Sequence, residues 1–203
     1  MATVKELMSL DGCVSVVTGG ATGLGLQMAT ALAEAGSNVV ISGRARIAPP
    51  EDTPLEGWQK ESDLNITAPF ICAQVLGREM IKAQRGSIIN IASVAGMLGR
   101  DPKTYNSIAY CASKGALVNF TRDLAVKWAP HNIRVNAICP GTFVTTFNEK
   151  MFDRIKEHVL RGVPLGRTGG PDDLKGIVVL LASDASNFMT GAIIPVDGGA
   201  VAW

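Results

Sequence analysis

The stretch that most constrains the fold is residues 14–25, where a short apolar run enters a glycine-rich segment, TGGATGLG. The β-branched run predicts a strand. From Leu24 to Ala35 apolar residues then recur at helical spacing, and Gly36 follows as a typical helix-ending residue. A strand, a glycine-rich turn and a helix in this order predict an α/β protein with a parallel sheet.

The glycines of this turn suit a bound phosphate. Gly19, Gly23 and Gly25 allow a ligand to approach the backbone closely, and the amides at the start of the helix attract a pyrophosphate. A glycine-rich turn without a ligand is the alternative. The strand before and the helix after provide the context that a dinucleotide site requires, so the sequence favours such a site.

The next predicted strand, residues 38–42, is followed by Gly43 and Arg44 and ends without a carboxylate. An acidic residue here would bind the adenosine ribose and favour NAD, whereas an arginine can neutralise a 2′-phosphate and favour NADP. NADP is therefore the preferred cofactor, with NAD as the alternative. A solvated surface charge is the other role open to Arg44.

Two candidate catalytic segments lie in the second half of the chain. Residues 86–91 form an apolar run typical of a parallel strand buried on both faces, and Ser93 follows its carboxyl end. Tyr110 and Lys114 stand four residues apart at the start of a helix predicted to stop before Pro130, so they share a face. An ammonium group near a phenol stabilises the phenolate, which predicts a lowered tyrosine pKa and acid–base chemistry.

Together these motifs resemble the short-chain dehydrogenase/reductase family of the single-domain type. TGGATGLG resembles its cofactor motif, DLNIT its helix asparagine, NIAS its catalytic serine, and YCASK its tyrosine and lysine. CPGTFVT resembles the segment that covers the nicotinamide, while GRTGGPDDL and TGAIIPVDGG resemble the last helix and strand. The resemblance implies a Rossmann-type doubly wound parallel sheet in three layers, forming one domain over residues 1–203.

The resemblance also implies a hydride transfer between a nicotinamide and a small carbonyl compound or secondary alcohol, such as a 3-oxoacyl thioester or a sugar acid. Tyr110 is then the acid or base, Lys114 lowers its pKa, Ser93 binds the reacting oxygen, and Asn65 holds a proton-relaying water. Purely structural roles are the alternatives: Ser93 as a strand-end cap and Asn65 as a hydrogen-bonding residue in a bent helix. The cofactor contacts implied are Thr18, Gly19, Thr22, Gly23, Leu24, Gly25, Arg44, Tyr110, Lys114, Pro140, Gly141, Thr142, Val144 and Thr145.

One segment of the family pattern is missing. Family members place a helix, strand, helix and strand between the second strand and the loop before Trp58, about 50 residues on average element lengths. Here VVISGR runs directly into ARIAPPEDTPLEGW, with the junction near residues 44–48. A naturally shortened member, a misjoined gene and a sequence with a segment left out all fit this gap.

The missing fourth strand normally lies beside the first, so its loss leaves unpaired backbone at the centre of the sheet. Our hypothesis is that residues 38–42 substitute for it, with Arg46 where a glycine belongs. A shortened fold of this kind has a second functional interpretation: a catalytically impaired or noncatalytic protein that binds partners or oligomerises.

Composition excludes other classes of function. Lys and Arg number 19 against 18 Asp and Glu, so there is no basic excess for nucleic acid. No secretory signal and no apolar run long enough for a bilayer are found, which predicts a cytoplasmic protein without a membrane partner. The four cysteines lack metal-ligand spacing, so reduced core thiols and no metal are expected. The resemblance alone implies a homo-oligomer, a dimer or tetramer.

Other features receive structural interpretations. Tyr105 is a weaker rival to Tyr110 because no lysine follows it four residues on. Residues 147–160 predict a helix that either covers the substrate pocket or is a plain surface helix. His131 and His158 are expected to be solvated. Pro171 is expected to begin a helix.

Overall fold

The structure, a computed structural model, describes residues 2–42, 50–101, 107–144 and 149–203. Helices and parallel strands alternate along the chain, as expected of a Rossmann-like α/β fold. The strands are β1 (Val14–Thr18), β2 (Asn38–Ser42), β3 (Gly86–Ile91), β4 (Ile133–Pro140) and β5 (Ile193–Val196). The α-helices are α1 (Val4–Met8), α2 (Gly23–Glu34), α3 (Leu55–Ser62), α4 (Ala68–Ala83), α5 (Ile108–Trp128), α6 (Glu149–Arg161) and α7 (Lys175–Ala182).

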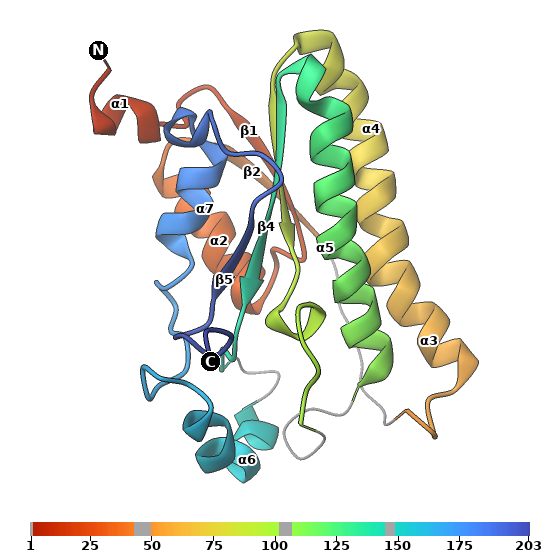
Figure 1. Cartoon of the computed structure of the whole chain (residues 1–203). Helices are drawn as coiled ribbons and strands as arrows, with labels where there is room; N and C mark the ends of the chain where they lie inside the picture. Colours follow the sequence, from red (N-terminus) through yellow and green to blue (C-terminus); the bar gives the residue numbers. More distant parts are fainter. Residues whose placement is uncertain (1, 43–49, 102–106, 145–148) are drawn as a thin grey trace.

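The strands form two parallel sheets. In the first, β1 pairs with β2, and in the second the order is β3-β4-β5. The helices α4 and α5 lie on one side of β3 and β4, and α2 and α7 lie on the other (Figure 1). This arrangement confirms the predicted fold class and its three layers.

Helix packing connects the two sheets. Helix α2, which follows β1, packs against α7, and α7 packs against β3 and β4. One cluster of buried side chains joins these elements, with Leu32 from α2, Val178 and Leu181 from α7, and Ile138 from β4. No strand pairing joins the two sheets among the described residues. Burial of apolar surface therefore holds the two sheets together.

The hypothesis that residues 38–42 replace the missing central strand is wrong. Strand β2 pairs with β1 in register from Val14 opposite Asn38 to Thr18 opposite Ser42. Within the described part of the chain it forms no pairing with β3. A strand that follows directly after a short crossover helix pairs with the strand before that helix, and this local βαβ geometry determines the position of β2. Arg46 lies outside the described residues.

The strand at 86–91 is also less buried than expected. Every residue of β3 except Asn90 is half-buried, whereas seven of the eight residues of β4 are buried, six of them in one continuous run. Within the described chain β3 has a strand neighbour on the β4 side alone. The prediction of a fully buried strand assumed a neighbour on both sides.

Helix α5 ends where the sequence predicts, whereas α7 begins later than predicted. Helix α5 ends at Trp128, before Pro130, as predicted. The Trp128 ring packs so closely on α4 that a Cβ at Gly77 would lie 2.2 Å from it. Residues 171–174 form turns, and α7 begins at Lys175 and not at Pro171. No helix among the described residues is long and apolar enough to cross a membrane.

Candidate active site

Ser93 lies where β3 ends, at the start of the short 3₁₀ turn η2 (Val94–Gly96). It is 9% exposed, and its Oγ accepts a hydrogen bond from the Ala95 N–H at 3.1 Å. A Cβ at Gly96 would lie 2.4 Å from the carbonyl carbon of Lys114. Glycine therefore lets this turn contact the backbone of α5, which brings Ser93 to the catalytic helix.

Tyr110 and Lys114 lie on the first turns of α5, beside Ser93. The side chains of Ser93 and Tyr110 share a hydrogen bond. The Lys114 ammonium lies 5.5 Å from the centroid of the Tyr110 ring and donates to the Ile91 carbonyl at 2.8 Å. The structure thus brings Ser93, at the end of β3, next to Tyr110 and Lys114, at the start of α5.

The predicted lowering of the tyrosine pKa is wrong for this structure. Burial raises the pKa of Tyr110 above its usual value, and the hydrogen bond with Ser93 offsets only part of the rise. Burial also lowers the pKa of Lys114 to about 8. Desolvation is thus the largest influence on the pKa of both groups. The spacing of the two residues showed their proximity but not their desolvation.

Asn65 lies within a π-helical turn, η1 (Asp63–Thr67), between α3 and α4. It is 8% exposed, and its Nδ2 donates to Oε1 of Glu61 at 2.9 Å. This contact agrees with the expected hydrogen bonding within a bent helix. Glu61 is itself only 5% exposed, an unusual burial for a glutamate. Sequence reasoning missed it, although a lone carboxylate one helical turn before Asn65 was the available signal.

The glycine-rich turn has the geometry of a phosphate cradle. Gly19 and Gly23 have φ values of +76° and +54°, which glycine adopts readily. A Cβ at Gly25 would lie 2.0 Å from the Gly19 carbonyl oxygen, so the turn closes tightly on the start of α2. Thr22, the residue before α2, makes no side-chain cap, and the helix N-terminus thus offers its amides to an anion. Thr18 ends β1 before this turn, and Leu24 lies in the first turn of α2.

The segment from Pro140 to Val144 leaves the end of β4 beside the end of β5. A Cβ at Gly141 would lie 2.7 Å from the Cα of Asp197, so the two strand ends approach closely. The Thr142 carbonyl accepts from the Gly169 N–H at 2.9 Å. These contacts hold the predicted cofactor-covering segment at the carboxyl edge of the sheet. Thr145, like Arg44, lies outside the described residues.

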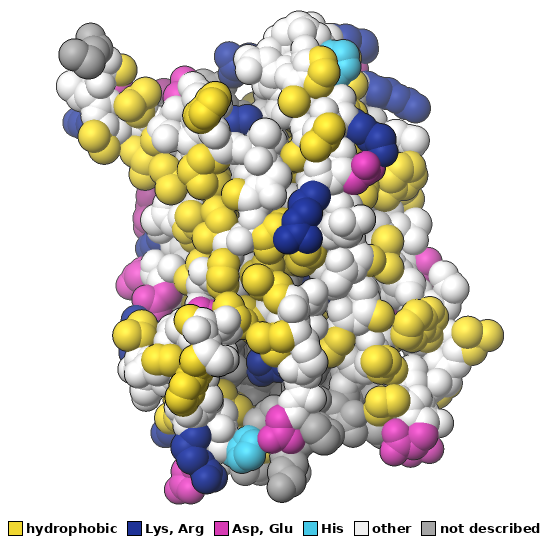
Figure 2. Space-filling view, viewed as in Figure 1, with side chains coloured by type: hydrophobic (Ala, Val, Ile, Leu, Met, Phe, Trp, Pro, Cys, Tyr) yellow, Lys and Arg dark blue, Asp and Glu magenta, His cyan; other side chains and the backbone are white. Residues whose placement is uncertain are grey.

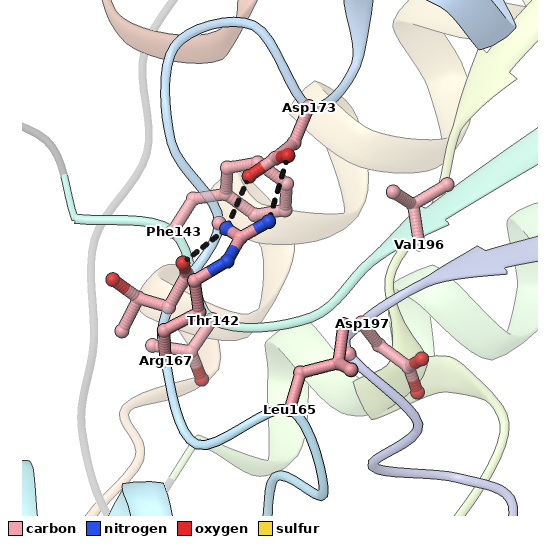
Figure 3. A pocket seen from close by; sticks show the side chains of 10 residues that line it. Thr142, Phe143, Leu165, Arg167, Asp173, Val196 and Asp197 are labelled. Atoms are coloured by element: carbon pink, nitrogen blue, oxygen red, sulfur yellow. Dashed lines mark hydrogen bonds and ion pairs between the residues drawn. The ribbon is translucent and has the colours of Figure 1, made fainter.

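A small pocket of about 110 Å³ lies beside this segment (Figure 3). Arg167 and Asp173 face each other across its wall in a two-bonded ion pair, with N–O distances of 2.6 and 3.0 Å. The Gly170 N–H adds a third bond to Asp173, and these contacts lower the pKa of that carboxyl to about 2. The ion pair fixes the loop that supports Thr142. The pocket beside it is too small for a dinucleotide.

Helix α6 contacts the segment that ends at Asp101. Nε2 of His158 lies 2.6 Å from Oδ2 of Asp101, which is the last described residue before the gap at 102–106. The side chain of His158 is 40% exposed, which agrees with the expected solvation, and tertiary structure adds a carboxylate partner. Tyr105 lies outside the described residues. The four cysteines form no disulfide, and Cys139 is the one among them that is buried.

Comparison with known proteins gives consistent results. The profile of the family described as enoyl-(acyl carrier protein) reductase matches residues 43–201. A NAD-dependent glycerol dehydrogenase of Listeria innocua is 40% identical over 159 residues, which are 78% of this chain and 61% of the relative. The chain therefore spans less than two thirds of that relative.

Two further matches extend over the whole chain. A galactitol 2-dehydrogenase of Rhizobium johnstonii is 31% identical over 257 residues, covering 98% of this chain and 99% of the relative. That alignment is longer than the chain of 203 residues, so the relative carries residues with no counterpart here. A gluconate 5-dehydrogenase of Burkholderia cenocepacia, solved in complex with NADP and tartrate, superposes with a TM-score of 0.92 and 27% identity over 99% of this chain and 100% of that one.

Proposed function

Because this chain belongs to the short-chain dehydrogenase/reductase family, we propose that it transfers a hydride between a nicotinamide cofactor and a small secondary alcohol or its carbonyl. The observation that carries the proposal is the hydrogen-bonded pair of Ser93 and Tyr110 with Lys114 beside it. Two hydroxyl groups at one point, next to an ammonium group, suit a carbonyl oxygen that gains negative charge.

In this proposed reaction, the residues of the chain have separate roles in transferring the proton and stabilising charge. Tyr110 gives its phenolic proton to the carbonyl oxygen during reduction, or takes it from the alcohol during oxidation. Ser93 donates to the same oxygen and orients it. Lys114 has a pKa of about 8 and supplies positive charge below that pH. The bound nicotinamide supplies or accepts the hydride.

The described residues fit a dinucleotide at both ends. The tight turn closed by Gly25 and the uncapped start of α2 suit the pyrophosphate, and the segment at Gly141 and Thr142 suits the nicotinamide end. NADP is the preferred form, because β2 ends without a carboxylate and Arg44 follows it. The complex of the Burkholderia gluconate 5-dehydrogenase with NADP agrees with this choice, whereas the name of the Listeria relative favours NAD.

Polyols and sugar acids are the proposed substrate class. The relatives named above act, by their names, on glycerol, galactitol and gluconate. Reduction of 3-oxoacyl thioesters is the second candidate, since a 3-oxoacyl-[acyl-carrier-protein] reductase of Thermotoga maritima is 38% identical over 146 residues. The free cysteines fit the reducing cytoplasm as the place of action.

Self-association along α4 and α5 is part of the proposal. Phe70, Ile71 and Val75 on α4 are about half exposed, at 49%, 50% and 54%. A groove of about 370 Å³ runs between α4 and α5, with Phe120 and Trp128 in its wall. Figure 2 shows hydrophobic side chains along this side of the molecule. Exposed apolar surface of this kind favours a homo-oligomeric contact, which sedimentation of wild type and Phe70→Glu will test.

The test of the function is a calorimetric titration of NADPH, and then NADH, into protein of verified intact mass. We expect binding in the micromolar range, stronger for NADPH, and turnover of polyols or sugar acids. Tyr110→Phe is the control: it should retain cofactor binding and lose activity by about 10²–10⁴-fold, because a general acid is removed. Absence of heat with either cofactor would contradict the proposal and favour the noncatalytic interpretation.

A further inference from the structure

Glu61 is the buried carboxylate next to the reactive groups that the proton chemistry above does not use. On the outer side of α3 the acidic side chain of Glu56 pairs with Lys60, and Gln59 pairs with Asp63, in exposed contacts one helical turn apart. Glu61 instead turns inward and is 5% exposed. Burying an ionised carboxylate is costly unless charge or hydrogen bonds compensate it.

The compensation comes from two sides. Asn65 donates its Nδ2 to Glu61 at 2.9 Å, in a bond that is itself buried. Helix α3 and the turn η1 both pack against α5, the helix that carries Lys114. The ammonium of Lys114 donates a hydrogen bond to the neutral Ile91 carbonyl, and Glu61 lies close enough to influence Lys114 electrostatically.

We propose that Glu61 is a positioning residue of the reactive site: its carboxylate fixes the Asn65 amide and provides the negative charge that balances Lys114. The proposal rests on the proposed function, since it assigns Glu61 a part in that same site. A carboxylate favours the protonated forms of neighbouring groups, because it attracts the ammonium and repels the phenolate. Consistent with this, Glu61 raises the pKa of both Lys114 and Tyr110.

The other ionisable groups near this site are few. Cys139 on β4 acts on both Lys114 and Tyr110, and Cys111 on α5 acts on Tyr110. Burial raises the pKa of both thiols, so they remain protonated where Lys114 titrates. Among the described groups that influence Lys114, Glu61 is therefore the one carboxylate.

The test compares Glu61→Gln with wild type in full-length protein labelled with [¹³C]lysine. Glutamine keeps an oxygen that accepts from Asn65 but removes the charge. The Cε signal of Lys114, assigned by its loss in Lys114→Arg, reports the protonation of that residue alone. We expect a midpoint near pH 8 in wild type, and one at least about 0.5 pH units lower in Glu61→Gln.

Glu56→Gln is the matched control, because it removes an exposed carboxylate from the same helix and should leave the Lys114 midpoint unchanged. Glu61→Asp keeps the charge, so its midpoint should lie closer to that of wild type even if Asn65 loses its bond. An equal midpoint in wild type and Glu61→Gln would overturn the proposal. If Glu61→Gln does not fold, a Glu61→Asp midpoint as low as the one expected for Glu61→Gln would overturn it instead.

A second measurement links the charge to catalysis. The acid limb of the pH profile for alcohol oxidation should move to lower pH in Glu61→Gln, since both Lys114 and Tyr110 lose protons more easily. A lower rate with an unmoved limb would indicate a purely structural role and contradict the proposal. A shifted Lys114 midpoint in a protein without turnover would instead contradict the proposed function and leave the role of Glu61 supported.

Discussion

The two sheets of this molecule differ in how well their strands are covered. Strand β4 lies at the centre of β3-β4-β5, where Val135, Ala137 and Ile138 are fully buried. In the β1–β2 pair, by contrast, Val14 is 71% exposed and Val16 47% exposed. Equal apolar character in the sequence thus gives unequal burial, because a strand is covered only when neighbours exist on its edges and faces.

This difference separates two parts of the proposed function. Ser93 follows β3, and Tyr110 and Lys114 lie on α5, which packs against β4. The glycine-rich turn lies between β1 and α2, which the packing of α2 on α7 connects to the rest. The proposed proton chemistry therefore depends on the β3-β4-β5 sheet, whereas the proposed phosphate binding depends on a contact between helices.

The largest expected effect compares the stability of the two sheets. Ile138→Ala removes a fully buried side chain from β4 and should lower the free energy of unfolding by about 2–5 kcal/mol. Val16→Ala changes a half-exposed residue of β1 and should stay within about 0.5 kcal/mol. Urea unfolding of both variants will measure the difference, and similar losses would show that β1 is as well covered as β4.

The next effect concerns the phosphate cradle. Gly25→Ala places a Cβ at 2.0 Å from the Gly19 carbonyl oxygen, so the turn must open. We expect NADPH affinity to fall by about tenfold or more, equivalent to about 1.4 kcal/mol, with the Lys114 midpoint unchanged. Gly176→Ala on α7 is the control, because nothing lies within 4 Å of its added Cβ. Unaltered NADPH affinity in Gly25→Ala would refute the assignment of this turn to the cofactor.

The smallest effect concerns the loop beside the cofactor-covering segment. Asp173→Asn removes the ion pair with Arg167 and should lower the melting temperature at neutral pH. Because the folded pKa of Asp173 is about 2 and its ordinary value is 3.8, this stabilisation is complete above pH 3.8 and is lost as the pH falls through 2.

Melting curves of wild type and Asp173→Asn across this range should therefore converge at the acid end. Asp123→Asn, which removes an exposed carboxylate paired with Lys127 on α5, is the control and should change the melting temperature less. A difference between wild type and Asp173→Asn that persists at pH 2 would contradict the role of the ionised pair.

Much of the site followed from local patterns. The glycine-rich turn between β1 and α2 and the four-residue spacing of Tyr110 and Lys114 are properties of neighbouring residues, so the sequence predicted them. The position of β2 was mispredicted, because the hypothesis required a pairing with β3 that its local connection through α2 does not favour. The contact of His158 with Asp101 was not predicted, because the two residues are 57 positions apart along the chain.

The sequence by itself determined the alternation of strands and helices, the glycine-rich turn and the proposed catalytic set of Ser93, Tyr110 and Lys114. Only the tertiary structure decided the division into two sheets, the burial of Glu61 and the direction of the Tyr110 pKa. The physical reason is the same in each case. Local propensity and spacing act between neighbours in the chain, whereas pairing, desolvation and charge depend on which distant segments share a space.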